Sequence, residues 1–371
     1  MAETNDTLPT TMQAMVLMGH GDMDQLVFHT DWPVPEIGPH EVLLKVLACG
    51  LNNTDVNTRT AWYSKGVSDA TTGGAFDGAD DEDATWGGAA ITFPRIQGAD
   101  ICGEVMAVGA DVEPALIGKR VMVDTWLRDW DDPLNKDKSG YFGSECDGGF
   151  AQFNKIDARH VHVVESPLSD IEIATFATAY ITAENMLERA NVGPGDSVLI
   201  PGASGGVGSA LIQLAKRRGA SAIAMASKTK HEDVARLNPD AILDRAPVDL
   251  KADLKAATGR ESVSVVADVV GGDGFGHIID VLERGGRYTC AGAIAGPIVE
   301  FDMRTFYLRD LTFTGATVVA PDLFGKLVSY INAGDVKPVL AASYPLRELH
   351  IAQQAFIDKK HVGNIVVCPW D

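Results

Sequence analysis

The chain has 371 residues with a formal net charge of −20, and 46% of its residues are hydrophobic. This composition is that of a globular enzyme, and the length suggests two domains. The negative charge argues against nucleic acids and anionic membranes as partners, and no run of about 18 apolar residues is present to span a membrane.

Two further features indicate a cytoplasmic location. Segment 1–13 is polar and lacks the apolar core of a signal peptide. The five cysteines are scattered and form no C-x-x-C pair, which is typical of free thiols in a reducing compartment.

The first part of the chain is rich in short β-like runs. Strands are predicted at 13–17, 41–47, 102–108 and 120–123, with glycine-containing turns between them. The last segment ends in another strand-like run at 362–368, which can rejoin this part. We therefore predict a discontinuous β-rich domain made of residues 1–166 and 336–371.

Residues 64–93 interrupt this domain with an acidic, glycine-rich insertion. Its composition predicts little regular structure. One interpretation is a solvated surface insertion. The other is a lid over the active site, with Trp86 as its apolar tip.

The segment SVLIPGASGGVGSALIQLAKRRG at 197–219 has the pattern of a strand, a glycine-rich turn and a helix. A second apolar run at 221–226 completes a βαβ unit. Such a turn lets backbone N–H groups approach a pyrophosphate at the helix N-terminus. An alanine replaces the first glycine of the G-x-G-x-x-G pattern, and a tight turn without a ligand is the alternative. We expect a dinucleotide site at Ala203, Ser204, Gly205, Gly206, Val207 and Gly208.

The residues after the second strand bear on which dinucleotide binds. NAD sites usually place an Asp or Glu about 20 residues after the turn, for the ribose 2′-hydroxyl. This chain has Ser227, Lys228 and Lys230 there instead. A hydroxyl and two cations suit a 2′-phosphate, so we predict NADP(H) bound by these residues. The alternative is an ordinary solvated loop.

The strand–helix alternation continues toward the C-terminus. Strands are predicted at 241–243, 263–267, 287–290 and 311–319, with helices at 233–237, 250–258 and 275–282 between them. This alternation is typical of a doubly wound parallel sheet. We therefore predict a Rossmann nucleotide-binding domain over residues 167–335.

Taken together, these stretches resemble the medium-chain dehydrogenase/reductase superfamily over nearly the whole chain. Besides the glycine turn, the matching stretches are GPHEVLLKVLACGLNNTDV at 38–56, GADICGEVMAVGADV at 98–112, GKRVMV at 118–123, DGGFAQF at 147–153, DVVGG at 268–272, GGRYTCAG at 285–292 and GNIVV at 363–367. The resemblance implies an α/β fold, with a GroES-like catalytic domain, a Rossmann domain and substrate between them. It also implies a homodimer or homotetramer.

The superfamily divides into zinc alcohol dehydrogenases and zinc-free reductases. A catalytic zinc needs three protein ligands of Cys, His or carboxylate type. The zinc branch has a Cys where this chain has Asn52, and a His-Glu pair where it has Ala99-Asp100. The four cysteines of the structural zinc lobe are also missing, because Cys146 stands alone. The resemblance therefore implies no metal, and Cys49 and Cys102 are interpreted as small core residues.

The zinc-free branch, which includes quinone and enoyl reductases, shares an Asn, an Asp and a downstream Tyr, here Asn52, Asp55 and Tyr63. Hydride addition to an acceptor conjugated with a carbonyl needs hydrogen-bond donors rather than a Lewis acid. The Asn52 amide would supply one, and Tyr63 would donate a proton or hydrogen bond. The alternatives are a packing role for Tyr63, a turn role for Asn52 and a structural role for Asp55.

Other cofactor residues are implied by the same resemblance. Thr182 would line the nicotinamide site, while Gly271, Ala291 and Gly292 would lie beside the cofactor after later strands. Asn364 stands where a Lys often contributes to binding.

Three functions remain open at this point. We expect an NADPH-dependent, zinc-free reductase of a quinone or an α,β-unsaturated carbonyl compound. The first alternative is a zinc-type alcohol or aldehyde dehydrogenase with unfamiliar ligands such as Cys49, Cys146 or Asp100. The second is an NADP-binding sensor or structural protein without turnover. The acidic insertion disfavours a CoA thioester, so small quinones or enones are the expected substrates.

Overall fold

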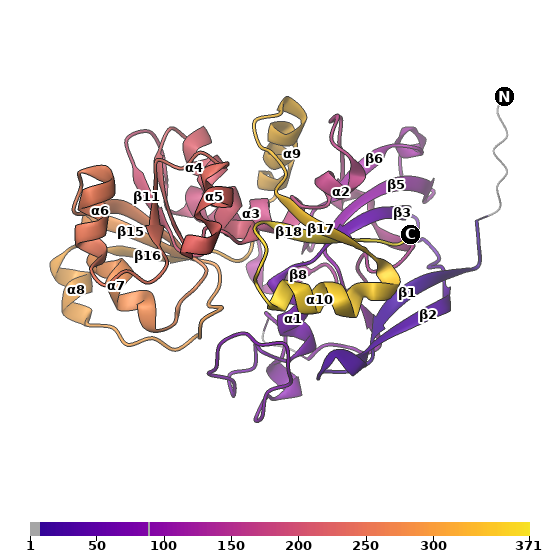
Figure 1. The fold of residues 1–371 in the computed structure, drawn as a ribbon. Coiled ribbons are helices and arrows are strands. Elements are labelled where there is room, and N and C mark those ends of the chain that lie inside the picture. Colours follow the sequence, from indigo (N-terminus) through magenta and orange to yellow (C-terminus); the bar gives the residue numbers. More distant parts are fainter. Residues whose placement is uncertain (1–7, 88–89) are drawn as a thin grey trace.

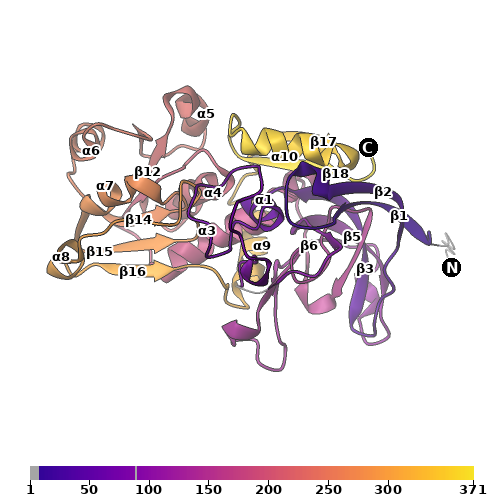
Figure 2. The same ribbon diagram turned by 90° about the horizontal axis from the view of Figure 1, so that it is seen from below.

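The computed structural model describes residues 8–87 and 90–371. The chain forms a β-rich domain and a parallel α/β domain that lie side by side (Figures 1 and 2). The predicted combination of a GroES-like domain with a Rossmann domain is thereby confirmed. No helix in the described ranges is long and apolar enough to cross a membrane.

The β-rich domain is built around two sheets in which most strands pair antiparallel. The smaller has the strand order β2 (Leu26–Pro33), β1 (Thr11–Leu17), β4 (Arg95–Ile96). The larger has the order β10 (Val161–Val163), β6 (Arg120–Val123), β5 (Asp100–Val108), β3 (Glu41–Gly50), β18 (Asn364–Cys368), β17 (Leu340–Pro345), and β9 (Phe153–Asp157) also pairs with β3. A hairpin-like pair, β7 (Trp126–Leu127) and β8 (Gly140–Tyr141), and the short helices α1 (Asn53–Arg59) and α2 (Asp170–Ile173) complete it.

The C-terminal segment returns to this domain. Strand β18 pairs antiparallel with β3, where Val366 lies opposite Gly50. Strand β17, which the sequence pattern did not predict, extends the same sheet, and α10 (Leu349–Ile357) lies across it (Figure 1). The boundaries at 166/167 and 335/336 stay a prediction.

The Rossmann domain contains one parallel sheet of the order β13 (Ala241–Asp244), β12 (Ser221–Ala226), β11 (Ser197–Ile200), β14 (Val263–Asp268), β15 (Leu282–Cys290), β16 (Thr312–Gly315). Its helices are α3 (Ala177–Arg189), α4 (Gly206–Arg217), α5 (His231–Ala235), α6 (Leu250–Thr258), α7 (Phe275–Asp280), α8 (Met303–Leu308) and α9 (Leu323–Ala333). Successive residues of β11 point to opposite faces: Val198 joins the core beneath α3 and α4, whereas Leu199 joins the core beneath α6 and α7.

Two predicted elements differ from the structure. The helix expected over 275–282 ends at Asp280, because Leu282 already pairs with Val263 at the start of β15. The strand expected over 311–319 covers only Thr312–Gly315, and the chain then turns toward the cavity at Ala316 and Thr317.

The described residues of the insertion, 64–87 and 90–93, have little regular structure, as its composition predicts; a short 3-10 turn covers Asp81–Asp83. It is nevertheless tied to both domains. The Thr71 N–H donates to the Ile294 carbonyl in the Rossmann domain at 3.0 Å. The fully buried Arg59 donates to the Gly73 carbonyl at 3.0 Å. The described part of the insertion therefore bridges the domains.

Candidate active site

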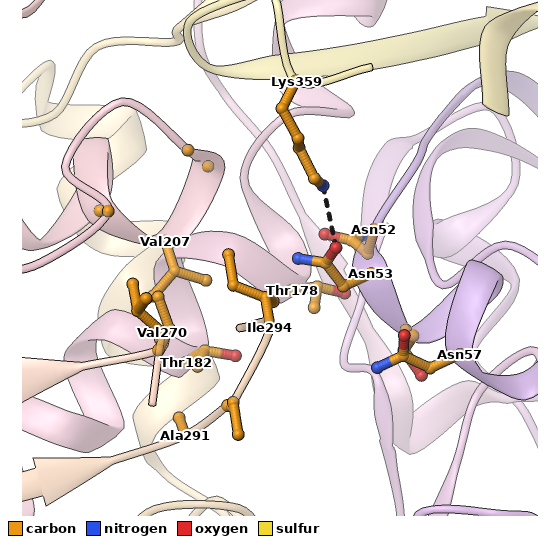
Figure 3. Close-up of a pocket in the computed structure, with 18 of the residues that line it drawn as sticks. Asn52, Asn53, Asn57, Thr178, Thr182, Val207, Val270, Ala291, Ile294 and Lys359 are labelled. Carbon is orange, nitrogen blue, oxygen red and sulfur yellow. Dashed lines mark hydrogen bonds between the residues drawn. The ribbon is translucent and has the colours of Figure 1, made fainter. Parts of the chain in front are cut away.

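A cavity of about 480 Å³ lies where the two domains meet. One wall comes from the glycine turn and the carboxyl ends of β12, β14 and β15, and the other from the start of α1 and a group of aromatic side chains. In Figure 3, Val207, Val270 and Ala291 lie on one side and Asn52, Asn53 and Asn57 on the other. A cavity at the carboxyl ends of parallel strands is where ligands of open α/β sheets bind.

The glycine turn follows β11 and opens into α4. Ser204, Gly205, Gly206, Val207 and Gly208 all line the cavity. Gly202 has a φ of +66°, which favours glycine. Ala203 is buried behind the turn and donates its N–H to the Met225 carbonyl at 3.0 Å, so it supports the turn rather than lining it.

The loop before β18 packs directly on this turn. The Gly363 N–H donates to the Ser204 carbonyl at 2.9 Å. A Cβ at Gly206 would lie 2.3 Å from Asn364 Oδ1, so the close approach depends on glycine. Asn364 therefore lines the cavity, as expected, beside the helix N-terminus.

The residues after β12 separate into two groups. Ser227 and Lys230 line the cavity, and Lys230 Nζ donates to the carbonyls of Lys359 and His361 at 2.6 and 2.7 Å. Lys228 instead points to the surface, where its Nζ lies 3.6 Å from Asp244. The structure thus brings together two of the three predicted 2′-phosphate residues.

Two cations in the cavity were missed by the sequence analysis. Arg245 follows β13 and lies close enough to Lys230 to lower the pKa of that lysine, after the larger effect of burial. Lys359 follows α10, and its Nζ donates to Asn53 Oδ1 at 2.9 Å (Figure 3). Burial, together with nearby Lys230, lowers the pKa of Lys359 to about 7. A signal was present, because basic residues 359–361 directly precede the matched GNIVV stretch.

At the opposite wall, Asn52 is the N-cap residue of α1. Its N–H donates to Asp55 Oδ2 at 2.7 Å, and the Gly98 N–H donates to Asp55 Oδ1 at 3.2 Å. Asp55 is buried behind the cavity wall, whereas Asn52 lines it. Asp55 thus positions Asn52 at the start of the helix.

A buried hydrogen-bond chain runs beside Asn52. The Tyr141 hydroxyl lies 2.7 Å from Thr178 Oγ1, and the Thr178 hydroxyl and N–H both donate to Asp100 Oδ1. Burial raises the pKa of Asp100 to about 6 and, with repulsion from Asp100, that of Asp55 to about 7. The Asn52 amide lies near Asp100 and helps to lower its pKa, although Asn52 Nδ2 has no partner at ordinary hydrogen-bond distance among the described residues.

We expect these two carboxyls to make the folded state less stable as the pH rises. Their folded pKa values lie above the ordinary unfolded value of about 3.9, so the folded chain binds more protons between pH 4 and 7. The stability that the protonated Asp55 and Asp100 carboxyls contribute is therefore fully present below about pH 4, and it is lost as the pH rises through about 6 and 7. In Asp100→Asn this loss should be smaller by about 1–3 kcal/mol. Urea unfolding at pH 5 and pH 8 measures it; equal losses in both proteins would contradict the expectation.

Tyr63 also lines the cavity. Burial raises its pKa, and polar contacts with Thr54 and Asn57 partly offset that rise. Of the remaining predicted residues, Thr182, Ala291 and Gly292 line the cavity. Gly271 lies outside it, where its φ of +62° shapes the turn after β14.

The donor set does not fit a zinc ion. Cys49 is fully buried behind Gly98, where a Cβ would lie 2.8 Å from its Sγ. Burial raises the pKa of the Cys49 and Cys146 thiols, and neither residue lines the cavity. Within residues 8–87 and 90–371, no group of three or more His, Cys, Asp or Glu side chains is arranged to hold a metal.

A parallel sheet with a glycine turn, facing a β-rich domain across a cavity lined by hydrogen-bonding groups, defines a two-domain dinucleotide-dependent oxidoreductase. Residues 206–333 match the family of zinc-binding dehydrogenases, and residues 38–166 match the alcohol dehydrogenase GroES-like domain. The chain belongs to the medium-chain dehydrogenase/reductase superfamily, whose members typically use a nicotinamide cofactor.

Similar proteins include both alcohol dehydrogenases and an alkenal/one oxidoreductase. A crystal structure from Sinorhizobium meliloti 1021, provisionally named an alcohol dehydrogenase, is 43% identical, with a TM-score of 0.87 and 98% of each chain covered. An NADPH-dependent alkenal/one oxidoreductase of Arabidopsis thaliana is 26% identical over 98% of this chain and 81% of its own. An NAD-dependent alcohol dehydrogenase of Sulfolobus acidocaldarius is 26% identical over 92% of this chain and 95% of its own.

Proposed function

We propose that this oxidoreductase transfers hydride from NADPH to a quinone or an α,β-unsaturated carbonyl compound without a catalytic zinc. The supporting observation is the wall around Asn52. Neutral hydrogen-bonding groups occupy the place where the zinc branch has metal ligands, and Asp100 is engaged by Thr178. Such a wall stabilises negative charge on an oxygen but cannot coordinate a metal.

In this mechanism the bound cofactor supplies hydride, and the protein orients the acceptor and stabilises its oxygen. Addition to the β-carbon of an enone moves charge onto the carbonyl oxygen. The Asn52 side chain lines the cavity, and its amide is placed to donate to that oxygen. Tyr63 is placed to donate a second hydrogen bond from the same wall.

The cavity cations support NADPH over NADH. Ser227, Lys230 and Arg245 surround the end of β12, where the adenosine ribose lies in such sheets. Together they offer a hydroxyl and two cations to a 2′-phosphate. Lys359 and the N-terminus of α4 would hold the pyrophosphate between them. The cavity thus holds three basic side chains, Lys230, Arg245 and Lys359, in a chain whose net charge is −20.

A homodimer or homotetramer stays part of the proposal. Met303, Tyr307 and Leu308 on α8, with Ile298 before it, are exposed apolar side chains on the Rossmann domain. Strand β16 is the edge of the parallel sheet in the same domain. An edge strand beside an apolar face suits pairing with a second copy.

The test is NADPH consumption by chelator-treated protein with a conjugated enone and with a quinone. We expect undiminished turnover, a kcat/KM at least about tenfold higher with NADPH than with NADH, and elution as a dimer or tetramer from a sizing column. Activity that is lost on chelation and restored by zinc would overturn the proposal in favour of an alcohol dehydrogenase. Tight NADPH binding without turnover of any activated acceptor would favour a sensor.

A further inference from the structure

Aromatic side chains dominate the substrate side of the cavity. Trp86, Trp126 and Tyr141, here called the aromatic cluster, all line it and contact one another edge to face. The ring centroids of Trp86 and Trp126 are 4.8 Å apart, and those of Trp126 and Tyr141 are 5.2 Å apart. Trp62 and Tyr63, with centroids 5.7 Å apart, line the same cavity.

One member of the aromatic cluster comes from the insertion and is held in place by a carboxylate. The Trp86 indole N–H donates to Glu145 Oε2 at 3.2 Å, and the Tyr141 backbone N–H donates to the same oxygen at 2.7 Å. Glu145 therefore ties the Trp86 indole to the backbone of Tyr141. The indole face is positioned before substrate arrives, which lowers the entropic cost of binding a flat molecule.

None of the charged side chains in the cavity belongs to the aromatic cluster. Among the described lining residues, the charged side chains are Lys230, Arg245 and Lys359; Lys230 lies by the glycine turn, and Lys359 reaches the start of α1, where it donates to Asn53. The polar groups on the wall that includes the aromatic cluster are neutral amides and hydroxyls, including those of Asn52, Asn57 and Thr178. A substrate against these rings meets ring faces and neutral hydrogen-bonding groups.

We propose that the substrate is a flat, uncharged carbonyl compound conjugated to an aromatic ring, and that Trp86 determines this preference by contact with that ring. The inference rests on the proposed hydride transfer and narrows its substrate class. Aromatic contacts contribute beyond the burial of area, with a value that corresponds to a few-fold to about tenfold in affinity. A saturated ring of the same size would bury a similar apolar area but could not make an aromatic–aromatic contact with Trp86.

Two pairs of matched compounds test the proposal. Acetophenone and cyclohexyl methyl ketone are titrated calorimetrically into the protein with saturating NADP+, which requires no hydride transfer. We expect about tenfold tighter binding of the aryl ketone. The kinetic pair is 4-phenylbut-3-en-2-one and 4-cyclohexylbut-3-en-2-one, for which we expect a similar ratio of kcat/KM.

Trp86→Ala should bring both ratios close to one, while Trp86→Phe should retain most of the preference. Trp130→Ala is the matched control, because Trp130 packs on His160 outside the cavity and its loss should leave both ratios unchanged. Equal binding of the two ketones by the wild type, or a ratio that survives Trp86→Ala, would overturn the inference. Selective aryl binding without turnover of any enone would support it and contradict the proposed hydride transfer instead.

Discussion

Replacement of Gly208 by alanine is expected to weaken NADPH binding by up to about 100-fold. The new Cβ would lie 2.3 Å from the Gly202 carbonyl oxygen and 2.6 Å from Ala203 Cα, and both are backbone atoms of the glycine turn. Neither can move without displacing the turn from the N-terminus of α4. Overpacking of this kind costs about 1–3 kcal/mol, and the upper end corresponds to roughly 100-fold in affinity if the strain falls on the binding conformation. NADPH fluorescence titration measures the change.

The matched control is Gly276→Ala on α7. A Cβ at Gly276 meets nothing within 4 Å, and alanine favours a helix over glycine. This variant should bind NADPH as the wild type does and unfold at the same temperature or a slightly higher one. If Gly208→Ala bound NADPH with wild-type affinity, the close packing of turn and helix would have no part in forming the cofactor site.

Most residues of the predicted glycine turn line the cavity, and the sequence could place them because this part of the wall is contiguous in the chain. The strand, the turn and the helix occupy one short segment, so their glycines and apolar residues carry the geometry in their spacing alone. Within that segment, residue spacing could not predict which way each side chain points. Lys228 faces solvent whereas Lys230 faces the cavity, although both lie on the same short turn.

The opposite wall is assembled from distant segments, and the sequence analysis named Asn52, Tyr63 and Trp86 there but missed Trp62, Trp126 and Tyr141. These aromatic residues line one cavity because the insertion and the β7–β8 pair fold toward α1. Composition predicted that the insertion has little regular structure, which holds for its described residues, and the position of Trp86 in the cavity is the one expected for a lid. The buried role of Asp55 depends on the Gly98 N–H, which lies 43 residues away in the chain.

Arg59 binds the insertion at Gly73, and we expect Arg59→Met to destabilise the protein by about 3–5 kcal/mol. The guanidinium is fully buried and donates to Gln353 Oε1 at 3.0 Å, to the Gly21 carbonyl at 2.7 Å and to the Gly73 carbonyl at 3.0 Å. Methionine keeps much of the volume but leaves these acceptors without a donor, at about 1–3 kcal/mol each. Burial lowers the Arg59 pKa to about 10, which shows that the buried charge carries a desolvation cost. Arg59→Met removes this cost, so part of the stability lost with the hydrogen bonds is regained.

Urea unfolding measures the global effect, and limited proteolysis measures the local one. Cleavage within residues 64–87 should become faster in Arg59→Met, because the contact at Gly73 is lost. Arg304→Met is the control: Arg304 is exposed and pairs with Asp302 in a surface contact, so its replacement should change stability by less than about 0.5 kcal/mol. Since Trp86 belongs to the insertion, the loosened variant should also lose preference for aryl ketones. A destabilised Arg59→Met that kept that preference would mean that Glu145 alone holds Trp86 against the aromatic cluster.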